Sequence, residues 1–133
     1  MNCLQLRKFR SKRSKYNNRK VVVDGFKFDS VKESTRYRVL KAMQDSGLIR
    51  NLTVHPTFVL QEKFKDQFGF LHRAIKYEAD SQYFDVKLNS LVIEDVKAMN
   101  RKTGKLLLTE VYKIKKKMLI RHLPPGVVFR EYF

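Results

Sequence analysis

The sequence predicts a single mixed α/β domain, in which several short strands and two helices share one core. Two observations support this prediction: extended apolar segments separated by turn residues, and two segments whose apolar residues recur at helical spacing. The chain has 133 residues, of which 43% are hydrophobic, and this is enough for one core. Without an internal repeat or a linker, we expect one folded unit, residues 21–133, preceded by a basic arm, residues 1–20.

The folded unit is predicted to begin with a β-hairpin. Two short apolar segments, 21–23 and 26–28, flank the pair Asp24-Gly25. An Asp-Gly pair favours a two-residue turn that requires positive φ, so these segments are expected to pair as antiparallel strands.

A helix is predicted to follow directly, at about residues 30–46. Ser30 with Glu33 three residues later forms a capping box, in which the serine side chain accepts from the first turn and the glutamate reaches back. Gly47 supplies the C-terminal stop. The apolar side of the helix is predicted from residues at helical spacing, namely Val31, Thr35, Val39 and Met43.

The middle of the chain is predicted to be extended. Residues 49–64 favour strand, interrupted at His55-Pro56 because proline cannot donate to a central ladder. A polar turn at 65–69 follows. Residues 77–97 then predict two strands joined by a turn at Asn89-Ser90.

The last third of the chain predicts a basic loop, a helix and a final strand. The loop covers residues 98–105, the helix runs from Leu106 to about His122, and the strand covers 127–133. A Pro-Pro-Gly sequence separates this helix from the strand, because it cannot continue a helix. Loop and helix contribute cations that are candidates for phosphate contacts: Arg101, Lys102, Lys113, Lys115, Lys116 and Lys117.

An acid and a lysine end the most apolar strand, LVIEDVK. Side chains alternate between the faces of a strand, so Asp95 and Lys97 project together. Burying such charges is costly unless they are paired or bind a metal, and Asp80 on the partner strand is expected to converge on them. The same spacing at Asp85 and Lys87 flanks the turn and is expected to be exposed. An ordinary ion pair is the alternative for either Asp-x-Lys.

The charge balance makes a polyanion the expected partner. Lys and Arg number 29 against 13 Asp and Glu, which gives a formal net charge of +16. The arm contains no acid, so we expect it to contact phosphates; its alternatives are a solvated tail and a nuclear-import signal. Its candidate DNA-binding residues include Arg10, Lys12, Arg13, Lys15, Arg19 and Lys20.

Several chemistries are disfavoured by the motifs. No nucleophile pattern accompanies the three histidines, no glycine-rich phosphate loop indicates a nucleotide cofactor, and no paired His/Cys spacing indicates zinc. Carboxylates and lysines in a basic chain remain. Carboxylate oxygens suit Mg²⁺ or Mn²⁺, and a metal held beside a phosphodiester can activate water for hydrolysis.

The order of the candidate residues resembles the PD-(D/E)xK nuclease superfamily: Glu33 on the first helix, Asp80 on a strand, then Asp95 and Lys97 on the next. Within that superfamily, the chain resembles a family of small phage and prophage proteins, long described only as a domain of unknown function. The similar stretches are KYNNRKVVVDGFKFDSVKE, GLIRNLTVHPTFVL, IKYEADSQYFD, VIEDVK and YKIKKKML. The resemblance implies a restriction-endonuclease-like core, with a central mixed β-sheet flanked by helices.

The resemblance also implies roles for single residues. Glu33, Asp80 and Asp95 would bind Mg²⁺ or Mn²⁺, and Lys97 would assist the attacking water. For Glu33 the alternative is a purely structural role as the partner of the helix cap. Where the family pattern has glutamine before the proline, this chain has His55.

Together these features predict a Mg²⁺-dependent DNA endonuclease that recognises structure more than sequence. The resemblance extends to Holliday-junction resolvases, so branched DNA is the expected substrate, cleaved by metal-activated water. Two active sites are needed to resolve a four-way junction, and a homodimer is therefore expected by analogy. The alternatives are a basic nucleic-acid-binding module on a degenerate nuclease fold and a polybasic membrane-surface protein, which the absence of an amphipathic apolar stripe disfavours.

The expected location is the cytoplasm, or the host cytoplasm if the protein is phage-encoded. The N-terminus lacks an apolar signal-peptide core, and no apolar segment approaches the roughly 20 residues that span a bilayer. The single cysteine, Cys3, excludes an internal disulfide framework.

Overall fold

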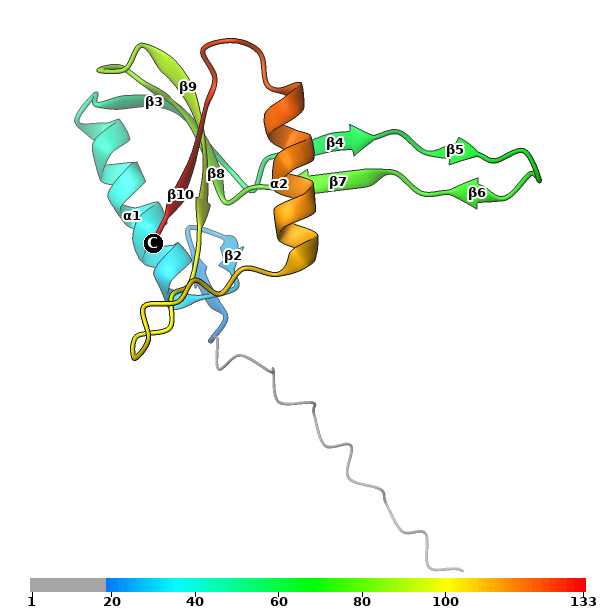
Figure 1. The fold of residues 1–133 in the computed structure, drawn as a ribbon. Coiled ribbons are helices and arrows are strands. Elements are labelled where there is room, and N and C mark those ends of the chain that lie inside the picture. The colour runs from blue at the N-terminus through cyan, green and yellow to red at the C-terminus, as the bar shows by residue number, and fades with distance from the viewer. Residues whose placement is uncertain (1–18) are drawn as a thin grey trace, which may run out of the picture.

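A computed structural model describes residues 19–133 of the chain (Figure 1). The predicted mixed α/β class is confirmed, because a four-stranded mixed sheet lies at the centre with a helix on each face. In the sheet, β8 runs antiparallel to β3 and β9, whereas β10 runs parallel to β9. The strand order is β10 (Val128–Tyr132), β9 (Ser90–Val96), β8 (Ser81–Asp85) and β3 (Ile49–Val54).

Two core clusters lie on opposite faces of β9, because its side chains alternate. On one face, Val92 packs with residues of β3, β8 and helix α1 (Val31–Asp45). On the other face, Ile93 packs against helix α2 (Glu110–His122), which forms the crossover that joins parallel strands β9 and β10. The buried members are Leu40, Ile49, Tyr83 and Val92 on the first face, and Leu60, Tyr77, Ala79, Ile93 and Leu119 on the second.

The predicted N-terminal hairpin and the start of the first helix are confirmed. Strands β1 (Val21–Val23) and β2 (Phe26–Phe28) pair across a turn in which Asp24 and Gly25 have φ of 51° and 80°. The backbone N–H of Glu33 donates to Ser30 Oγ over 3.2 Å, which caps α1.

The predicted apolar side of α1 is wrong. Ser34, Tyr37 and Leu40 are buried, whereas Val31 and Val39 are 53% and 44% exposed. Thr35 is also exposed, and of the predicted set only Met43 packs against the core. The cause is tertiary: the small Ser34 lets the helix approach the sheet, and the Tyr37 ring packs on Phe28, with ring centroids 5.2 Å apart.

The structure also corrects the predicted long strand that carried Asp80. Strand β7 (Ile75–Glu78) ends before this residue and β8 begins after it, so Asp80 lies in the link where the chain passes from one sheet to another. The turn before β9 covers residues 86–89, and Ser90 already pairs with Asp85. Asn89, with φ of 51°, closes this turn.

The second helix starts later than predicted. It begins at Glu110, where the backbone N–H of Tyr112 donates to Thr109 Oγ1 over 3.1 Å, and not at Leu106. Leu106 instead forms an isolated antiparallel bridge with Met99. The predicted last strand is confirmed as β10.

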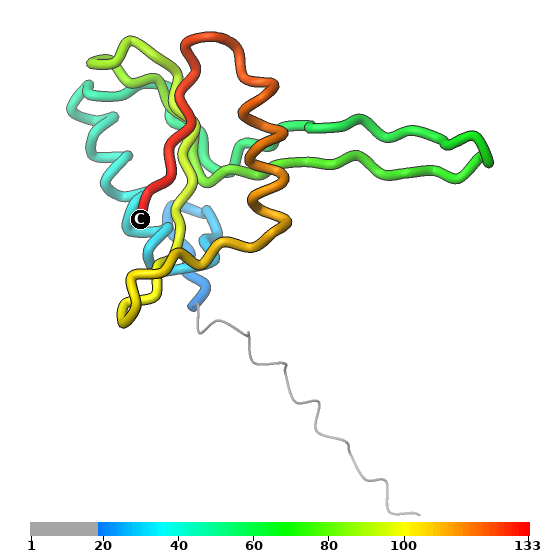
Figure 2. The backbone as a smooth tube through the Cα atoms, viewed as in Figure 1, coloured from blue at the N-terminus to red at the C-terminus, as the bar shows by residue number. Residues whose placement is uncertain are grey.

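A long two-stranded ribbon projects from the body of the protein (Figures 1 and 2). At its base β4 (Thr57–Gln61) pairs with β7, and farther out β5 (Phe64–Lys65) pairs with β6 (Leu71–His72). Within residues 19–133, neither helix is long and apolar enough to cross a membrane.

Candidate functional site

The four residues predicted from the sequence as a site lie near one another at one end of the central sheet. Glu33 is in the first turn of α1, Asp80 is in the link between β7 and β8, and Asp95 and Lys97 are at the end of β9. The site therefore assembles where a helix N-terminus, a strand crossing and a strand end meet.

The backbone holds Asp80 in place from three sides. Its N–H donates to Glu94 O over 3.2 Å, its carbonyl accepts from the N–H of His55 over 3.0 Å, and its Oδ2 accepts from the N–H of Val96 over 2.6 Å. Burial, and next the charges of Asp95 and Glu33, raise the pKa of its carboxyl group to about 8, although the hydrogen bond from Val96 lowers it. The site thus concentrates negative charge that a cation would stabilise.

Asp95 is 3% exposed and is held through one carboxylate oxygen. The hydroxyl of Tyr77 donates to Asp95 Oδ2, and Lys97 Nζ lies 3.3 Å from the same atom. Burial, and next the charge of Asp95, raise the pKa of Tyr77 and of Tyr112, so both phenols stay protonated. Lys97 Nζ also lies 3.9 Å from the centroid of the Tyr112 ring, a cation–π contact that fixes the lysine.

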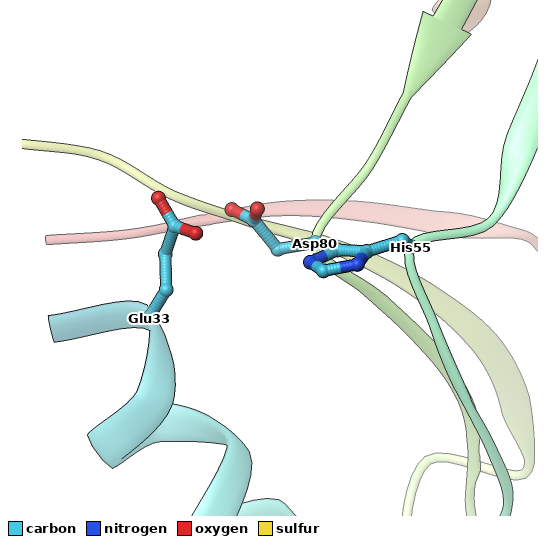
Figure 3. A group of neighbouring side chains, drawn as sticks. All are labelled: Glu33, His55 and Asp80. Atoms are coloured by element: carbon cyan, nitrogen blue, oxygen red, sulfur yellow. The ribbon is translucent and has the colours of Figure 1, made fainter. Parts of the chain in front are cut away.

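Three side chains that can bind a metal converge beside Asp95 (Figure 3). One ligand atom from each of Glu33, His55 and Asp80 lies within 4.8 Å of the others. In the part of the chain that the structure describes, this is the one group of three such side chains, and Asp95 adjoins it through Asp80. His55 adopts φ of 52°, a left-handed conformation that is uncommon outside glycine and is found at functional sites.

Glu33 has both of the roles considered from the sequence. Its Oε2 accepts from the backbone N–H of Asp29 over 3.2 Å, so it caps the entry to α1, one residue before the expected Ser30 N–H. Its carboxylate also points toward Asp80. Burial raises its pKa more than the Asp29 bond lowers it. The cap and the site therefore share one carboxylate.

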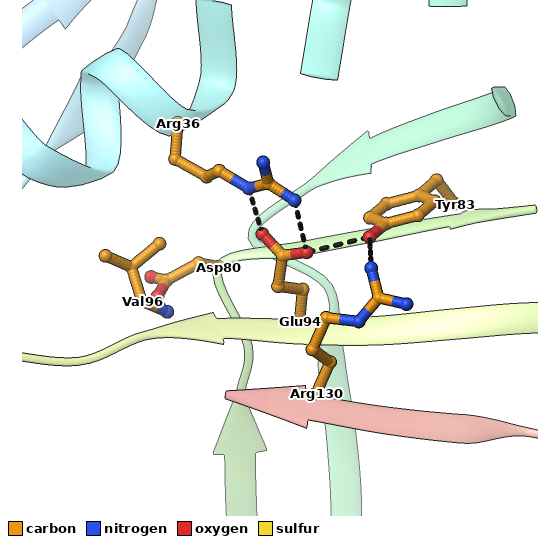
Figure 4. A network of polar contacts seen from close by, with 6 residues as sticks. All are labelled: Arg36, Asp80, Tyr83, Glu94, Val96 and Arg130. Atoms are coloured by element: carbon orange, nitrogen blue, oxygen red, sulfur yellow. Dashed lines mark hydrogen bonds and ion pairs between the residues drawn. The ribbon is translucent and has the colours of Figure 1, made fainter. Parts of the chain in front are cut away.

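On the opposite face of β9, a buried ion pair fixes the strand (Figure 4). Arg36 donates from Nε and Nη2 to the two oxygens of Glu94, over 2.6 and 2.9 Å, and Glu94 is fully buried. Tyr83 donates to Glu94 Oε2 over 2.7 Å, and Arg130 donates to Tyr83 over 3.2 Å. The pair joins α1 to β9 next to Asp95 and so sets the position of the site.

Two grooves of about 450 Å³ each meet at Lys97. The first lies between the ribbon base and α2 and is lined by Asp95, Lys76 and Lys115 among others. The second lies between α1 and the loop after β9, and its lining includes Glu33 and Arg101. Lys97 therefore faces both grooves, and each brings an acid of the site together with surface cations.

The predicted DNA-binding cations differ in their surroundings. Lys113 lies 2.9 Å from Glu110, and Lys116 contacts Glu131, so two of the helix lysines have acidic partners. Lys102 and Lys117 are exposed. Arg19 and Lys20 are exposed just before β1, whereas four predicted residues lie outside the described part of the chain: Arg10, Lys12, Arg13 and Lys15.

The other Asp-x-Lys is part of a turn. Asp85, the last residue of β8, accepts through Oδ1 from the backbone N–H of Leu88 over 3.0 Å. It is half-buried and not exposed as expected, whereas Lys87 is exposed. The sequence analysis missed His55, Tyr77 and Tyr112 as members of the site. The departure of His55 from the family pattern was the available signal for the first, whereas nothing local distinguished the two tyrosines from core residues.

The fold and the site together define a mixed α/β protein in which buried acids and a lysine lie between two cation-lined grooves. Residues 13–130 match the model of a family described as "Protein of unknown function (DUF1064)", and the chain therefore belongs to that family. No curated protein and no solved structure matches the chain. The family description names no activity, so the chemistry of the site is the basis for assigning a function.

Proposed function

We propose that this protein is a metal-dependent DNA endonuclease with a restriction-endonuclease-like fold, acting on DNA structure and preferring branched DNA. One observation carries the proposal: Asp80, Asp95 and Lys97 adjoin at the end of a central strand, with Glu33 reaching Asp80 from the first helix. The mixed sheet with a helix on each face supports this fold at the level of architecture.

The side chains present fit a divalent cation. Each aspartate has one oxygen bound by the protein, Asp80 Oδ2 to the Val96 N–H and Asp95 Oδ2 to Tyr77 and Lys97. Asp80, Glu33 and His55 form a donor set of two carboxylates and one imidazole, and Asp95 adjoins this set through Asp80. Carboxylates suit Mg²⁺, and the imidazole makes Mn²⁺ at least as good a fit. When bound, such an ion supplies Lewis-acid stabilisation of phosphate charge and lowers the pKa of water.

The remaining chemistry belongs to the chain itself. Lys97 faces both grooves and is fixed between Asp95 and the Tyr112 ring, so its ammonium group can stabilise charge that develops on a phosphate. Tyr77 orients Asp95 through its hydroxyl. Lys76 and Lys115 on one side, and Arg101 on the other, would hold the phosphodiester backbone across this point.

The preference for DNA structure follows from the kind of contact available. The net charge of +16 and the groove cations favour contacts to phosphates, which position a protein without reading sequence. Branched DNA as substrate, and a homodimer with two sites, come from the resemblance to junction resolvases and are part of the same proposal.

A non-catalytic nucleic-acid-binding module is the second candidate function. It is favoured by one observation: two of the acids already have partners within the protein. Asp95 forms an ion pair with Lys97, and Glu33 accepts a hydrogen bond from the Asp29 N–H. On this reading the site is a buried structural ion pair, and the grooves bind DNA without cutting it.

A pair of matched variants separates the two candidates. Asp95→Asn keeps the shape of the site and removes its charge, so under our proposal it abolishes cleavage while DNA affinity stays equal or rises. Asp85→Asn, in the other Asp-x-Lys, serves as the control and should leave cleavage unchanged. Cleavage is measured on end-labelled DNA with Mg²⁺ and with Mn²⁺, and binding is measured by fluorescence anisotropy in EDTA. Cleavage that survives Asp95→Asn would contradict the assigned role.

A further inference from the structure

The ribbon formed by β4 to β7 has no assigned role, although it projects far from the body of the protein (Figures 1 and 2). Its base is anchored, because Phe58, Leu60, Ile75 and Tyr77 pack in the core cluster under α2. No residue from 61 to 74 is buried. The outer half therefore contributes nothing to the core, and its conformation must be maintained for another reason.

The tip of the ribbon exposes large apolar side chains. Phe68 and Phe70 are 76% and 69% exposed, and Leu71 is 60% exposed. Contiguous exposed apolar groups of this kind mark interaction sites in soluble domains. Leaving these side chains exposed to water is unfavourable, and binding a partner that covers them would recover the free energy of their burial.

Hydrogen bonds hold these aromatic groups in a defined arrangement. Asp66 Oδ1 accepts from the backbone N–H groups of Phe68 and Phe70, over 2.8 and 3.0 Å. Asp66 Oδ2 lies 2.8 Å from His72 Nε2, and the His72 ring stacks on Phe64 with centroids 4.8 Å apart. The tip is thus a turn ordered by hydrogen bonds, and it exposes aromatic rings.

One face of the outer ribbon carries cations and no carboxylate. Lys65 pairs with Leu71 across the two strands, so both side chains lie on the same face. Side chains alternate along extended chains, which places Lys63 and Arg73 on this face as well. The face then carries three cations and no carboxylate, whereas Asp66 lies on the opposite face with Phe64 and His72. This charge is complementary to phosphate.

The base of the ribbon borders the candidate active site. Thr57, Lys76 and Tyr77, at the ribbon base, line the same groove as Asp95 and Lys97. A DNA backbone that crosses Lys97 through this groove would pass the base of the ribbon. A two-stranded ribbon is also narrow enough to enter the major groove, which is about 12 Å wide.

We propose that the ribbon is a branch-sensing DNA arm. Its basic face, formed by Lys63, Lys65 and Arg73, contacts phosphates beside the site, and the tip residues Phe68 and Phe70 stack on bases that are unpaired or unstacked at a branch. Aromatic rings stack on any base, which gives recognition of DNA structure without recognition of sequence. This inference rests on the proposed function in one respect, that the bound polymer is DNA.

The test is a binding experiment in EDTA, so that it does not depend on cleavage. Affinities of the full chain for a four-way junction and for a linear duplex of the same arms are measured over a range of salt concentrations. Phe68→Ser with Phe70→Ser should weaken junction binding by about tenfold or more and leave duplex binding unchanged. Replacing Lys63, Lys65 and Arg73 by glutamine should make the negative slope of log K against log salt shallower by about 2–3 on both substrates.

A matched control is Leu48→Ser, at a residue 57% exposed between α1 and β3, away from the ribbon. This variant should bind both substrates as the unaltered chain does. Circular dichroism should show all variants folded, because none of the altered residues is buried.

Three results would overturn the inference: junction affinity equal to that of the control, equal loss of affinity for both substrates in the phenylalanine variant, or a dimer in sedimentation that this variant converts to a monomer. The last would assign the tip to a second copy of the chain. Ribbon-dependent junction binding without any cleavage in Mg²⁺ or Mn²⁺ would support the arm and refute the nuclease. Metal-dependent cleavage of junctions by the unaltered chain, together with any of the three results above, would refute the arm alone.

Discussion

Asp80 and Asp95 are adjacent, yet different groups hold them. Asp80 is fixed by backbone N–H donors, and burial raises its pKa, whereas Asp95 is fixed by the Tyr77 hydroxyl and by Lys97. Hydrogen bonds from the surrounding structure hold both carboxylates in one orientation, which is what a catalytic side chain requires. His55, in the link between β3 and β4, adds an imidazole next to Asp80.

The proposed role of His55 as a metal ligand can be tested directly. His55→Gln removes the imidazole from the group with Glu33 and Asp80, so we expect Mn²⁺ affinity to fall by about tenfold or more. Isothermal titration calorimetry with Mn²⁺ measures this loss without any substrate. The matched control is His122→Gln, at the exposed end of α2. Equal Mn²⁺ affinities for the two variants would exclude His55 as a ligand.

Tyr77 is expected to act through Asp95. Tyr77→Phe removes the hydroxyl that donates to the buried carboxylate of Asp95 and leaves the packing of the ring, so the free energy of unfolding should fall by about 1.5–3 kcal/mol. The cleavage rate at saturating DNA should fall, while DNA affinity should not, because Asp95 loses its fixed orientation. Tyr132→Phe, on β10, is the control. An unchanged cleavage rate in Tyr77→Phe would show that Lys97 alone positions the carboxylate.

At the scale of elements, the Arg36–Glu94 ion pair fixes α1 against β9 on the face opposite Asp95. Its members are 12% and 0% exposed, so water screens them little. Arg36 also stacks on the Tyr132 ring, 4.2 Å from its centroid, which connects the pair to β10. The pair therefore joins three elements that surround the site.

Removing one member should be strongly destabilising. Arg36→Met leaves Glu94 charged and unpaired in the core, so the free energy of unfolding should fall by about 3–5 kcal/mol. Urea denaturation measures this loss. Lys41→Met breaks the exposed pair with Asp24, where the side chains are 48% and 43% exposed and water screens the charges, so the loss should be far smaller. Similar losses in both variants would contradict the assigned difference between the two pairs.

How far the sequence predicts each element depends on whether its signal is local. The N-terminus of α1 was predicted from Ser30 and Glu33 because a cap is a contact between neighbours in the chain. The buried face of the same helix was not, because Ser34 and Tyr37 are selected by the sheet and by β2, which lie far away in the sequence. The break at Asp80 has no glycine or proline to mark it; it results from strand pairing.

The same distinction explains which site residues were found. Asp95 and Lys97 follow a period-2 pattern within one strand, so their common side could be predicted. His55 comes from a separate strand crossing, and only the fold brings it to Asp80. The sequence predicts extended segments for the ribbon. Its projection from the body could not be predicted, because it depends on β4 to β7 pairing with one another and not with the central sheet.

At the scale of the whole molecule, cations surround a small acidic centre. The acids of the site lie between two grooves whose edges carry lysines and an arginine, and the chain as a whole carries +16. Such a field attracts a polyanion from any direction, whereas the grooves and the ribbon restrict how it binds. Binding strength and position of cleavage should therefore depend on different parts of the chain.

Deleting residues 1–14 tests the contribution of the arm. The deletion removes five cations, Arg7, Lys8, Arg10, Lys12 and Arg13. If they contact phosphates, the negative slope of log K against log salt should become shallower by as much as about 4, while the bond that is cut stays the same. Salt titrations followed by anisotropy measure the slope. An unchanged slope would contradict a role for these residues in DNA binding.

The most direct test of the central claim is cleavage of a labelled four-way junction by the purified full-length chain, beside a linear duplex control. Mg²⁺ or Mn²⁺ is compared with EDTA. Our account predicts metal-dependent nicks near the branch point, little cleavage of the duplex and none in EDTA. Tight junction binding with no cleavage in either metal would contradict the assigned nuclease and would favour the binding module.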